Sequence, residues 1–267
     1  MARPSDVKPH PVQTEISVGE IKLSIQMNNI QQIRMIIVYD NIPFDERLTK
    51  DWGFSCFIKG LEKSILFDTG RKGHILLSNM EKLSIRPEEI DLVFLSHAHK
   101  DHTDGLEALL AENSKIEVWL PEFFPSSFKE AIKAKGATVA EVDGFQKIYE
   151  GAYTTGVSSG WIREQSLILD TDKGLVVVTG CAHPRIVETI SKAKDLLEKG
   201  VHMVLGGFHL AGFLEEEIEE ITARFQSLGV KKVGPCHCSG EICRIMFANK
   251  YGDDFIKTGV GSEIKVP

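Results

Sequence analysis

The sequence contains no long apolar stretch. No run of hydrophobic residues approaches the roughly 18 residues that a membrane-spanning helix requires. The N-terminal residues 1–6 are not followed by an apolar segment, so they do not resemble a secretory signal peptide. We therefore expect a cytoplasmic protein with no membrane partner.

Cysteine is also scarce. The 267 residues include five cysteines, and an odd number argues against a disulfide framework. Cys56 stands apart, whereas the other four lie beside histidine motifs: Cys181, Cys236, Cys238 and Cys243. This arrangement favours free thiols in a reducing compartment.

Positive charge is in short supply. The formal net charge is −7, and no arm rich in lysine and arginine is evident. A long nucleic-acid backbone would be repelled on average, although a local basic patch could survive. We expect a small-molecule substrate and no nucleic-acid partner, while the oligomeric state stays open, a homo-oligomer included.

Composition and length are those of one globular domain. Hydrophobic residues make up 42% of the chain and charged residues 26%, as in ordinary globular proteins. A chain of 267 residues can bury a sizeable core. Residues 1–13 are polar and include three prolines, which predicts a flexible arm. Residues 14–267 are expected to form a single domain.

The apolar pattern alternates between strands and helices in two similar halves. Strict alternation predicts a half-exposed strand at residues 21–27, and an almost continuous apolar run predicts a covered strand at 33–39. Further strands are expected near residues 53–59, 64–67, 166–170, 175–179, 201–205 and 232–235, and helices near 71–83, 104–112, 122–135, 184–199 and 214–228. Pro184 would lie in the first turn of its helix and Gly200 just past its end. This rhythm predicts an α/β (or α+β) fold in which two mixed sheets face each other with helices outside.

A dense group of metal-binding side chains follows the apolar run at residues 91–95. His97, His99, Asp101 and His102 fall within six residues, a density that an ordinary solvated turn does not need. Side chains two residues apart in an extended chain point to the same side, so His97 and His99 can hold one ion. Asp101 and His102 come round the following turn and can serve a second ion. Imidazole and carboxylate suit zinc, iron or manganese.

This segment is the H-x-H-x-D-H signature of the metallo-β-lactamase superfamily. Three other segments resemble the strand-end aspartate and the later ligand motifs of that superfamily: residues 65–70, 179–184 and 235–240. A narrower combination resembles the branch of 7,8-dihydropterin-6-methyl-4-(β-D-ribofuranosyl)aminobenzene-5′-phosphate synthases: residues 53–55, 67–70, 180–183 and 206–210. The likeness covers roughly residues 33 to 262 and implies a four-layer αββα sandwich.

The resemblance also implies two divalent metal ions, zinc first, with manganese or iron as alternatives. His97 and His99 would hold the first ion, and Asp101 and His102 the second, with His237 as its last ligand. The superfamily often supplies a third ligand of the first ion from a histidine-containing turn, but residues 154–166 contain no histidine.

His183 is the natural replacement, because it ends a buried strand much as His97 does. Cys181 stands two residues earlier, where many relatives place a bridging aspartate or a cysteine, and is either a ligand or a second-shell residue. Asp68 would support a metal-bound histidine from the second shell.

Other residues are candidates for contact with substrate. Asp101 would orient the nucleophile as well as bind metal. His209 follows paired glycines and could donate a proton, bind substrate, replace His183 as a ligand, or pack as a structural histidine. Asn41 and Glu164 are candidates for substrate binding, with a purely structural role as the alternative for each. Aromatic residues between 119 and 165 would shape the pocket or fill the core.

The cysteines beside His237 allow two interpretations. In an extended segment Cys236 and Cys238 would face away from the side on which His237 points. Alternatively, these two cysteines, His237 and Cys243 could form a separate zinc site.

The ligand set predicts metal-dependent hydrolysis, or a related transfer, through a metal-bound hydroxide. The substrate would be a small phosphate- or ester-bearing metabolite, and the branch name implies a pterin-linked ribofuranosylaminobenzene phosphate. An alternative is a mononuclear iron dioxygenase acting on a thiol. A diiron oxygen reductase is disfavoured, because such relatives have glutamate where this chain has His99. A nuclease or a metal-holding module without turnover would be further alternatives.

Overall fold

The computed structural model describes residues 32–160 and 162–266. The expected arm at residues 1–13 and the expected strand at residues 21–27 lie outside this part of the chain. No helix in the described part is both long enough and apolar enough to cross a membrane.

The first sheet has seven strands in the order β13-β1-β2-β3-β4-β5-β6. Their bounds are β1 Ile33–Tyr39, β2 Ser55–Lys59, β3 Ile65–Phe67, β4 Leu92–Phe94, β5 Glu117–Pro121, β6 Thr138–Val142 and β13 Glu263–Val266. Strands β3 to β6 pair in parallel, while β1 pairs antiparallel with both β2 and β13. The strands expected near residues 53–59 and 64–67 form a hairpin, because β2 and β3 pair antiparallel.

The second sheet has six strands in the order β12-β11-β10-β9-β8-β7. Their bounds are β7 Gln146–Tyr149, β8 Ala152–Thr154, β9 Leu167–Thr171, β10 Gly174–Thr179, β11 Val201–Gly207 and β12 Lys232–Cys236. Strands β10, β11 and β12 are parallel, and β7 to β10 are joined in antiparallel pairs. Both sheets are therefore mixed.

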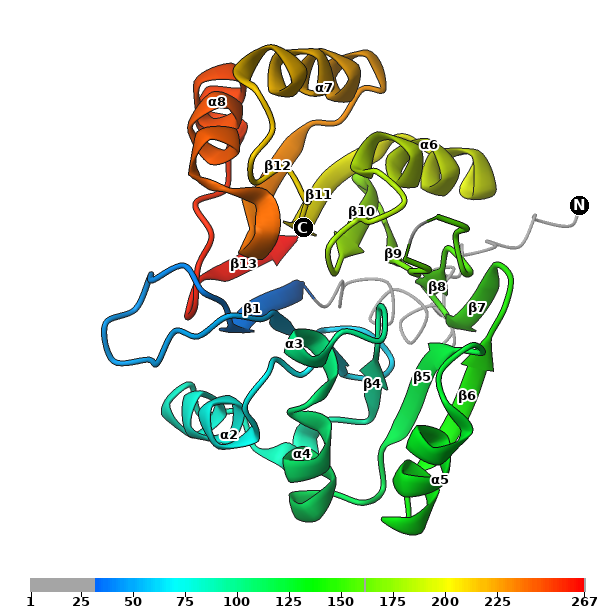
Figure 1. Cartoon of the computed structure of the whole chain (residues 1–267). Helices are drawn as coiled ribbons and strands as arrows, with labels where there is room; N and C mark the ends of the chain where they lie inside the picture. Colours follow the sequence, from blue (N-terminus) through cyan, green and yellow to red (C-terminus); the bar gives the residue numbers. More distant parts are fainter. Residues whose placement is uncertain (1–31, 161, 267) are drawn as a thin grey trace, which may run out of the picture. The chain divides into compact units, whose positions relative to one another are not determined.

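Helices lie on the outer face of each sheet (Figure 1). Those beside the first sheet are α2 Gly73–Lys82, α4 Leu106–Glu112 and α5 Ser126–Ala134, and those beside the second are α6 Ile186–Leu197, α7 Glu215–Ser227 and α8 Glu241–Tyr251. Four short helical segments connect the larger elements: α3 Lys100–Thr103, η1 Pro87–Glu89, η2 His237–Ser239 and η3 Gly252–Asp254.

Alternating side chains along the strands build three apolar layers. In β4, Leu92 and Phe94 enter the cluster between the two sheets, whereas Val93 points to the cluster beneath α2 and α4. Leu169 and Val178 complete the central cluster from the second sheet, and a third cluster fills the space beneath α6, α7 and α8. This alternation is the two-residue periodicity of β-strands. The predicted αββα sandwich is confirmed.

The start of helix α6 differs from the prediction. Helix α6 begins at Ile186, so Pro184 precedes the helix instead of lying in its first turn. The intervening Arg185 has φ 80°, which turns the chain before the helix starts. At the other end the helix stops at Leu197, where Glu198 takes the left-handed conformation with φ 49°, two residues before Gly200. The chain thus gains two residues of irregular backbone directly after His183.

The carboxyl ends of the parallel strands carry strained residues. Asp68 after β3, Ala182 after β10, His209 after β11 and His237 after β12 all have φ between 49° and 59°. A non-glycine residue in this region costs about 1–3 kcal/mol and persists only where its surroundings hold it. Such strain is typical of functional sites, and these four positions lie at the ends of strands where ligands bind in α/β sheets.

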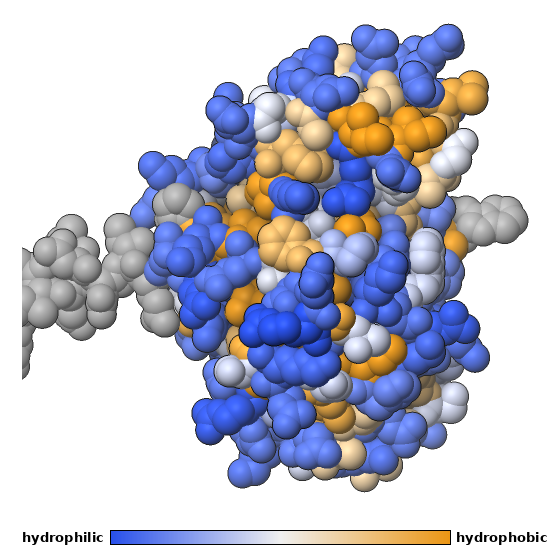
Figure 2. Space-filling view, turned by 90° about the vertical axis from the view of Figure 1, so that its left-hand side faces the viewer, coloured by the Kyte–Doolittle hydropathy of each residue, from blue (hydrophilic) through white to orange (hydrophobic). Residues whose placement is uncertain are grey.

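Figure 2 shows the side of the molecule that carries α8 and the loop between β1 and β2. Apolar side chains form separate patches there within a mainly hydrophilic surface. The exposed large apolar residues include Phe44 and Trp52 in the loop and Ile242 and Ile245 on α8.

Candidate metal centre

Six histidines from four strand ends lie side by side. They are His97, His99 and His102 after β4, His183 after β10, His209 after β11 and His237 after β12. Neighbouring ring centroids within this group are 4.2 to 5.0 Å apart. The sandwich thus brings together all six histidines that the sequence motifs singled out, whereas His74 and His202 belong to neither donor group described below.

The first group of donor atoms consists of His97, Cys181 and His183. Their donor atoms lie within 4.8 Å of one another. The His99 ring lies beside this group, 4.6 Å from His97 and 5.0 Å from His183. The buried Nε2 atom of His97 has no hydrogen-bond partner among the described residues, whereas Nδ1 lies 2.8 Å from the Ser96 hydroxyl. Buried polar atoms almost always have a partner, so this nitrogen fits a metal ligand.

The second group consists of His102, Cys181 and His237. The Nε2 atoms of His102 and His237 are 3.2 Å apart, and the Cys181 Sγ atom is 3.3 Å from His102 Nε2. Asp101 Oδ2 lies 3.4 Å from His237 Nε2 and 3.7 Å from His102 Nε2. Two imidazoles, a carboxylate and a thiol therefore face one point, as in a divalent metal site.

Cys181 is shared by the two groups. We expected it to be either a ligand or a second-shell support, and its sulfur lies where it can reach both positions. Gly180, the residue before Cys181, has no room for a side chain. A Cβ atom added at Gly180 would lie 2.1 Å from the Ser96 hydroxyl and 3.1 Å from Asp68 Oδ2.

Asp68 holds His102 in position. Its Oδ2 atom accepts hydrogen bonds from His102 Nδ1 at 2.7 Å and from the Ser96 hydroxyl at 2.8 Å. Its Oδ1 atom accepts the Ser96 backbone N–H at 2.8 Å. Burial raises the pKa of Asp68 well above its usual range, although the Ser96 hydrogen bonds oppose this shift. With Nδ1 bonded to Asp68, His102 directs Nε2 toward His237 and Cys181.

Replacing Asp68 by asparagine is expected to weaken metal binding at the His102 position by roughly 10–100-fold, the usual effect of losing a partner of a metal-bound histidine. An asparagine amide would donate to Nδ1, which moves the proton to Nε2 and blocks its lone pair. Competition with a chelator would measure the affinity. Asp45→Asn, a change at a partly buried aspartate outside the donor groups, is the matched control. Equal affinities in Asp68→Asn and the parent protein would contradict this role.

Glu164 takes the structural role, one of the two roles that we considered, and does not face substrate. Its side chain is buried, and Oε1 accepts the backbone N–H groups of Cys181 and Ala182, both at 2.9 Å. Oε2 accepts the backbone N–H of His183 at 2.9 Å and its Nδ1 at 2.8 Å. Burial opposes ionisation of Glu164, but its contacts with His183 and the nearby His97 hold its pKa below the usual range. The carboxylate orders the loop after β10 and has no oxygen directed at substrate.

Asn41 also acts on a histidine. Its Oδ1 atom lies 2.9 Å from His237 Nδ1, and its Nδ2 donates to the His237 carbonyl at 3.1 Å. Asp40 accepts the His237 backbone N–H at 3.2 Å, and burial raises the pKa of Asp40 to about 6. The structure thus makes Asn41 a positioning residue for His237, because both ends of its amide are taken by that residue.

Aromatic residues at the site come from an unexpected segment. Trp52 lies with its ring 5.0 Å from that of His237, and its side chain is half-exposed. No motif in the sequence marked Trp52, because it stands in the irregular loop between β1 and β2. In the segment from 119 to 165, Trp119 and Phe124 are buried in the core and Phe128 packs against it. These three aromatic residues therefore fill the core, one of the two roles that we expected for this segment.

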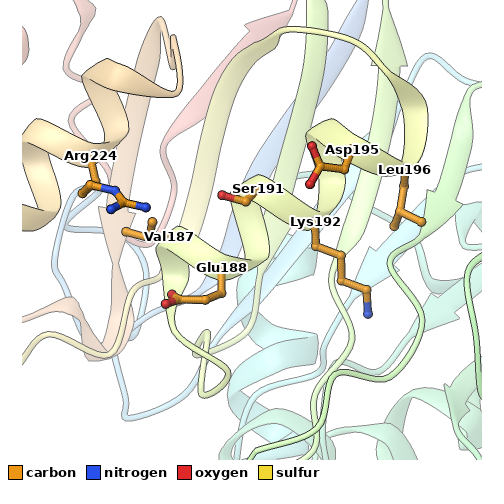
Figure 3. Close-up of a pocket in the computed structure, with 7 residues that line it drawn as sticks. All are labelled: Val187, Glu188, Ser191, Lys192, Asp195, Leu196 and Arg224. Carbon is orange, nitrogen blue, oxygen red and sulfur yellow. The ribbon is translucent and has the colours of Figure 1, made fainter.

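Two hollows adjoin each other along α6 and α7. One of about 580 Å³ is lined by His183 and His209 together with Arg185, Phe213 and Arg224. The other hollow, of about 490 Å³, is not lined by any of the candidate metal ligands. Side chains of α6 line it, and Arg224 of α7 lies at one side (Figure 3). Because only the first hollow touches the histidines, it is the candidate path for substrate.

Electrostatics favour neutral imidazoles at the centre of the site. Burial lowers the pKa of His97 well below its usual range, with the neighbouring His102 adding to the effect. Burial and the nearby His237 lower the pKa of His102 to about 3. Neutral imidazole is the form that binds metal, so these low pKa values suit His97 and His102 as metal ligands. At His237 burial acts in the same direction, but the hydrogen bond with Asp101 raises the pKa of the imidazole.

Comparisons with known proteins agree with this geometry. Residues 48–132 match the family model of the anti-Pycsar protein Apyc1. Among solved structures, Tm1679, a metal-dependent hydrolase of the β-lactamase superfamily, shares 26% sequence identity. The alignment covers 88% of this chain and 99% of Tm1679, with a TM-score of 0.72.

A curated relative decides the family. The 7,8-dihydropterin-6-methyl-4-(β-D-ribofuranosyl)-aminobenzene-5′-phosphate synthase of Methanocaldococcus jannaschii is 31% identical over 291 residues, which cover 89% of this chain and 99% of the relative. The chain belongs to this branch of the metallo-β-lactamase superfamily. A second, uncharacterized protein of the same organism is 26% identical over 234 residues, covering 76% of this chain and 90% of that protein. The fold carries the candidate ligands of this chain at the ends of strands from both sheets.

Proposed function

We propose that this metallo-β-lactamase-like protein is an enzyme that holds two divalent ions and acts on a small phosphate- or ester-bearing metabolite. The observation that carries the proposal is the position of Cys181, whose sulfur is shared by the His97–His183 group and the His102–His237 group. Two adjoining donor groups with a common thiol match a dinuclear site better than two separate ones.

The residues divide into two ligand sets. His97, His99 and His183 would hold the first ion, Asp101, His102 and His237 the second, and Cys181 would lie between them. When bound, such ions supply Lewis acidity and lower the pKa of a coordinated water, so that it can attack near neutral pH. Glu164, Asp68 and Asn41 keep three imidazoles oriented through their Nδ1 atoms.

Asp101 is the proposed catalytic carboxylate. Burial opposes its ionisation, but the hydrogen bond from His237 holds the pKa of Asp101 below its usual range. Its side chain is only partly buried, so a water molecule can reach it. An ionised carboxylate at this position can accept the proton of an attacking water or hydroxyl group.

The hollow beside His183 and His209 supports the substrate class. The exposed Arg185 and Arg224 offer cationic groups for a phosphate, and Phe213 offers a half-exposed ring for stacking. Three glutamates on the same walls can accept N–H groups of a ligand: Glu188, Glu217 and Glu220. A metabolite with a phosphate and an amino-substituted ring, as in the name of the methanogen relative, fits these walls.

Metal content tests the proposal directly. Protein purified without added metal is expected to contain about two ions per chain, and His183→Ala and His237→Ala are each expected to lose about one. The physical reason is that these histidines belong to different donor groups. Elemental analysis against protein concentration measures the stoichiometry.

His74→Ala is the matched control, because that histidine is exposed on α2 away from both groups. Fewer than one ion per chain in the parent protein, or no loss in either histidine variant, would contradict the dinuclear site. Hydrolysis of phosphodiester, lactone and thioester probes by the loaded parent protein then assigns the class of bond.

A further inference from the structure

A third group of donor atoms adjoins the two histidine groups. It consists of Cys181 after β10, His209 after β11 and Cys238 in η2, and their donor atoms lie within 4.8 Å of one another. Both thiols are free and buried, whereas His209 is exposed at the hollow between α6 and α7. Two of the three residues, His209 and Cys238, belong to neither of the other donor groups.

Local backbone structure creates this group. We expected Cys238 to face away from the site in an extended segment, but residues 237–239 form a helical turn that reverses the chain. The turn brings the Cys238 thiol to 3.8 Å from the Cys181 carbonyl. His209 reaches the same point because its φ of 54° bends the chain directly after β11.

Gly207 keeps the space between the two cysteines open. A Cβ atom added there would lie 2.7 Å from Cys238 Sγ, 2.3 Å from the Gly180 carbonyl and 3.2 Å from the Cys181 Cα atom. Because two of these three atoms are backbone, they cannot move aside cheaply. The approach of the two thiols therefore depends on a residue without a side chain at this position.

We propose that Cys181, His209 and Cys238 form a third metal position that binds a thiophilic divalent ion such as zinc. Zinc binds thiolate at about 2.3 Å and imidazole at about 2.0 Å, so the donors of one tetrahedral site lie roughly 3.5–3.8 Å apart. The three donor atoms are within reach of that arrangement. Two thiolates favour zinc over magnesium or calcium, which prefer oxygen ligands.

His209 lines the hollow between α6 and α7, so a ligand in that hollow would approach the group from the His209 side. An ion held by Cys181, His209 and Cys238 would need one further ligand to become tetrahedral. Two cysteines, a histidine and an open position form a donor set found in catalytic zinc sites. This assignment gives His209 the role of metal ligand, one of the roles that the sequence left open.

The inference rests on the proposed function at one residue, since Cys181 is common to all three groups. Cobalt titration separates the two ideas, because cobalt bound to thiolate shows a charge-transfer band in the near ultraviolet. Metal-free full-length protein would be titrated with Co²⁺ under reducing, anaerobic conditions. We expect a third equivalent whose binding adds to this band, and Cys238→Ser is expected to lose that equivalent and its share of the band.

Cys236→Ser is the matched control, since Cys236 also adjoins His237 but is buried in the core between the sheets. It should keep three equivalents. His209→Asn, a change at an exposed side chain, should lose the third equivalent even if Cys238→Ser does not fold. A double variant His97→Ala, His102→Ala should lose the histidine-bound equivalents yet keep the band that depends on Cys238.

Two results would overturn the third position. One is a titration of Cys238→Ser and His209→Asn that matches the parent protein in both stoichiometry and absorption. The other is a Cys181–Cys238 disulfide that persists under reductant, detected as two thiols fewer with no metal bound. Failure of the proposed dinuclear site would give a different result. The parent protein would then bind no cobalt at the histidines, but the band that depends on Cys238 would still form.

Discussion

Asp101→Asn is expected to lower turnover by about 10²–10⁴-fold, the usual contribution of a general acid or base. The amide keeps an oxygen for metal binding but cannot accept a proton. Asp101 is placed for that task because its Oδ2 atom lies 3.7 Å from His102 Nε2 and 3.4 Å from His237 Nε2. Its lowered pKa keeps the carboxylate ionised. The measurement is kcat and KM on whichever phosphodiester, lactone or thioester probe the metal-loaded parent protein hydrolyses.

The control for this variant is Asp104→Asn, which changes an exposed aspartate at the end of α3. It should leave kcat within the error of the parent value. Metal content must also be measured in Asp101→Asn, so that a loss of ions is separated from a loss of proton transfer. Unchanged kcat in a variant that retains both ions would exclude Asp101 as the catalytic carboxylate.

Glu164→Ala is expected to lower the free energy of unfolding by about 3–5 kcal/mol, because several buried donors lose their acceptor at once. The change would leave three consecutive backbone N–H groups and His183 Nδ1 without their acceptor. Each unsatisfied buried donor costs about 1–3 kcal/mol, although water entering the space offsets part of this. Urea unfolding of the metal-free protein, followed by circular dichroism, measures the difference.

Glu188→Ala provides the comparison, because Glu188 is exposed on the neighbouring helix α6 and should change stability by less than about 0.5 kcal/mol. Glu164→Ala should also weaken the first metal position, since His183 loses its orientation. A variant as stable as the parent protein, with undiminished metal binding, would show that the loop after β10 is ordered by other contacts.

Local sequence was enough to predict many of the elements and the first ligand segment. The strands and helices expected from alternating and 3.6-residue apolar patterns lie close to their expected positions. Helix α8 and the strands β5 to β8 and β13 were not predicted. His97, His99, Asp101 and His102 stand within six residues after a buried strand, so their proximity did not depend on the rest of the fold. Residues 180–183 and 235–240 were also marked as later site motifs by resemblance alone.

Contacts between those motifs were decided only by the tertiary structure. Cys181 lies between two histidine groups because the strand order places β10 and β4 in facing sheets, which no local pattern specifies. For Glu164 and Asn41 the sequence left substrate binding and a structural role open, and packing directs their oxygens to His183 and His237. Cys238 joins the site because a single turn at His237 replaces the extended backbone that we assumed. Side-chain direction at a strand end depends on φ and on neighbours from distant strands. The sequence by itself therefore determined which residues could bind metal. The packed sheets decided which of these residues meet.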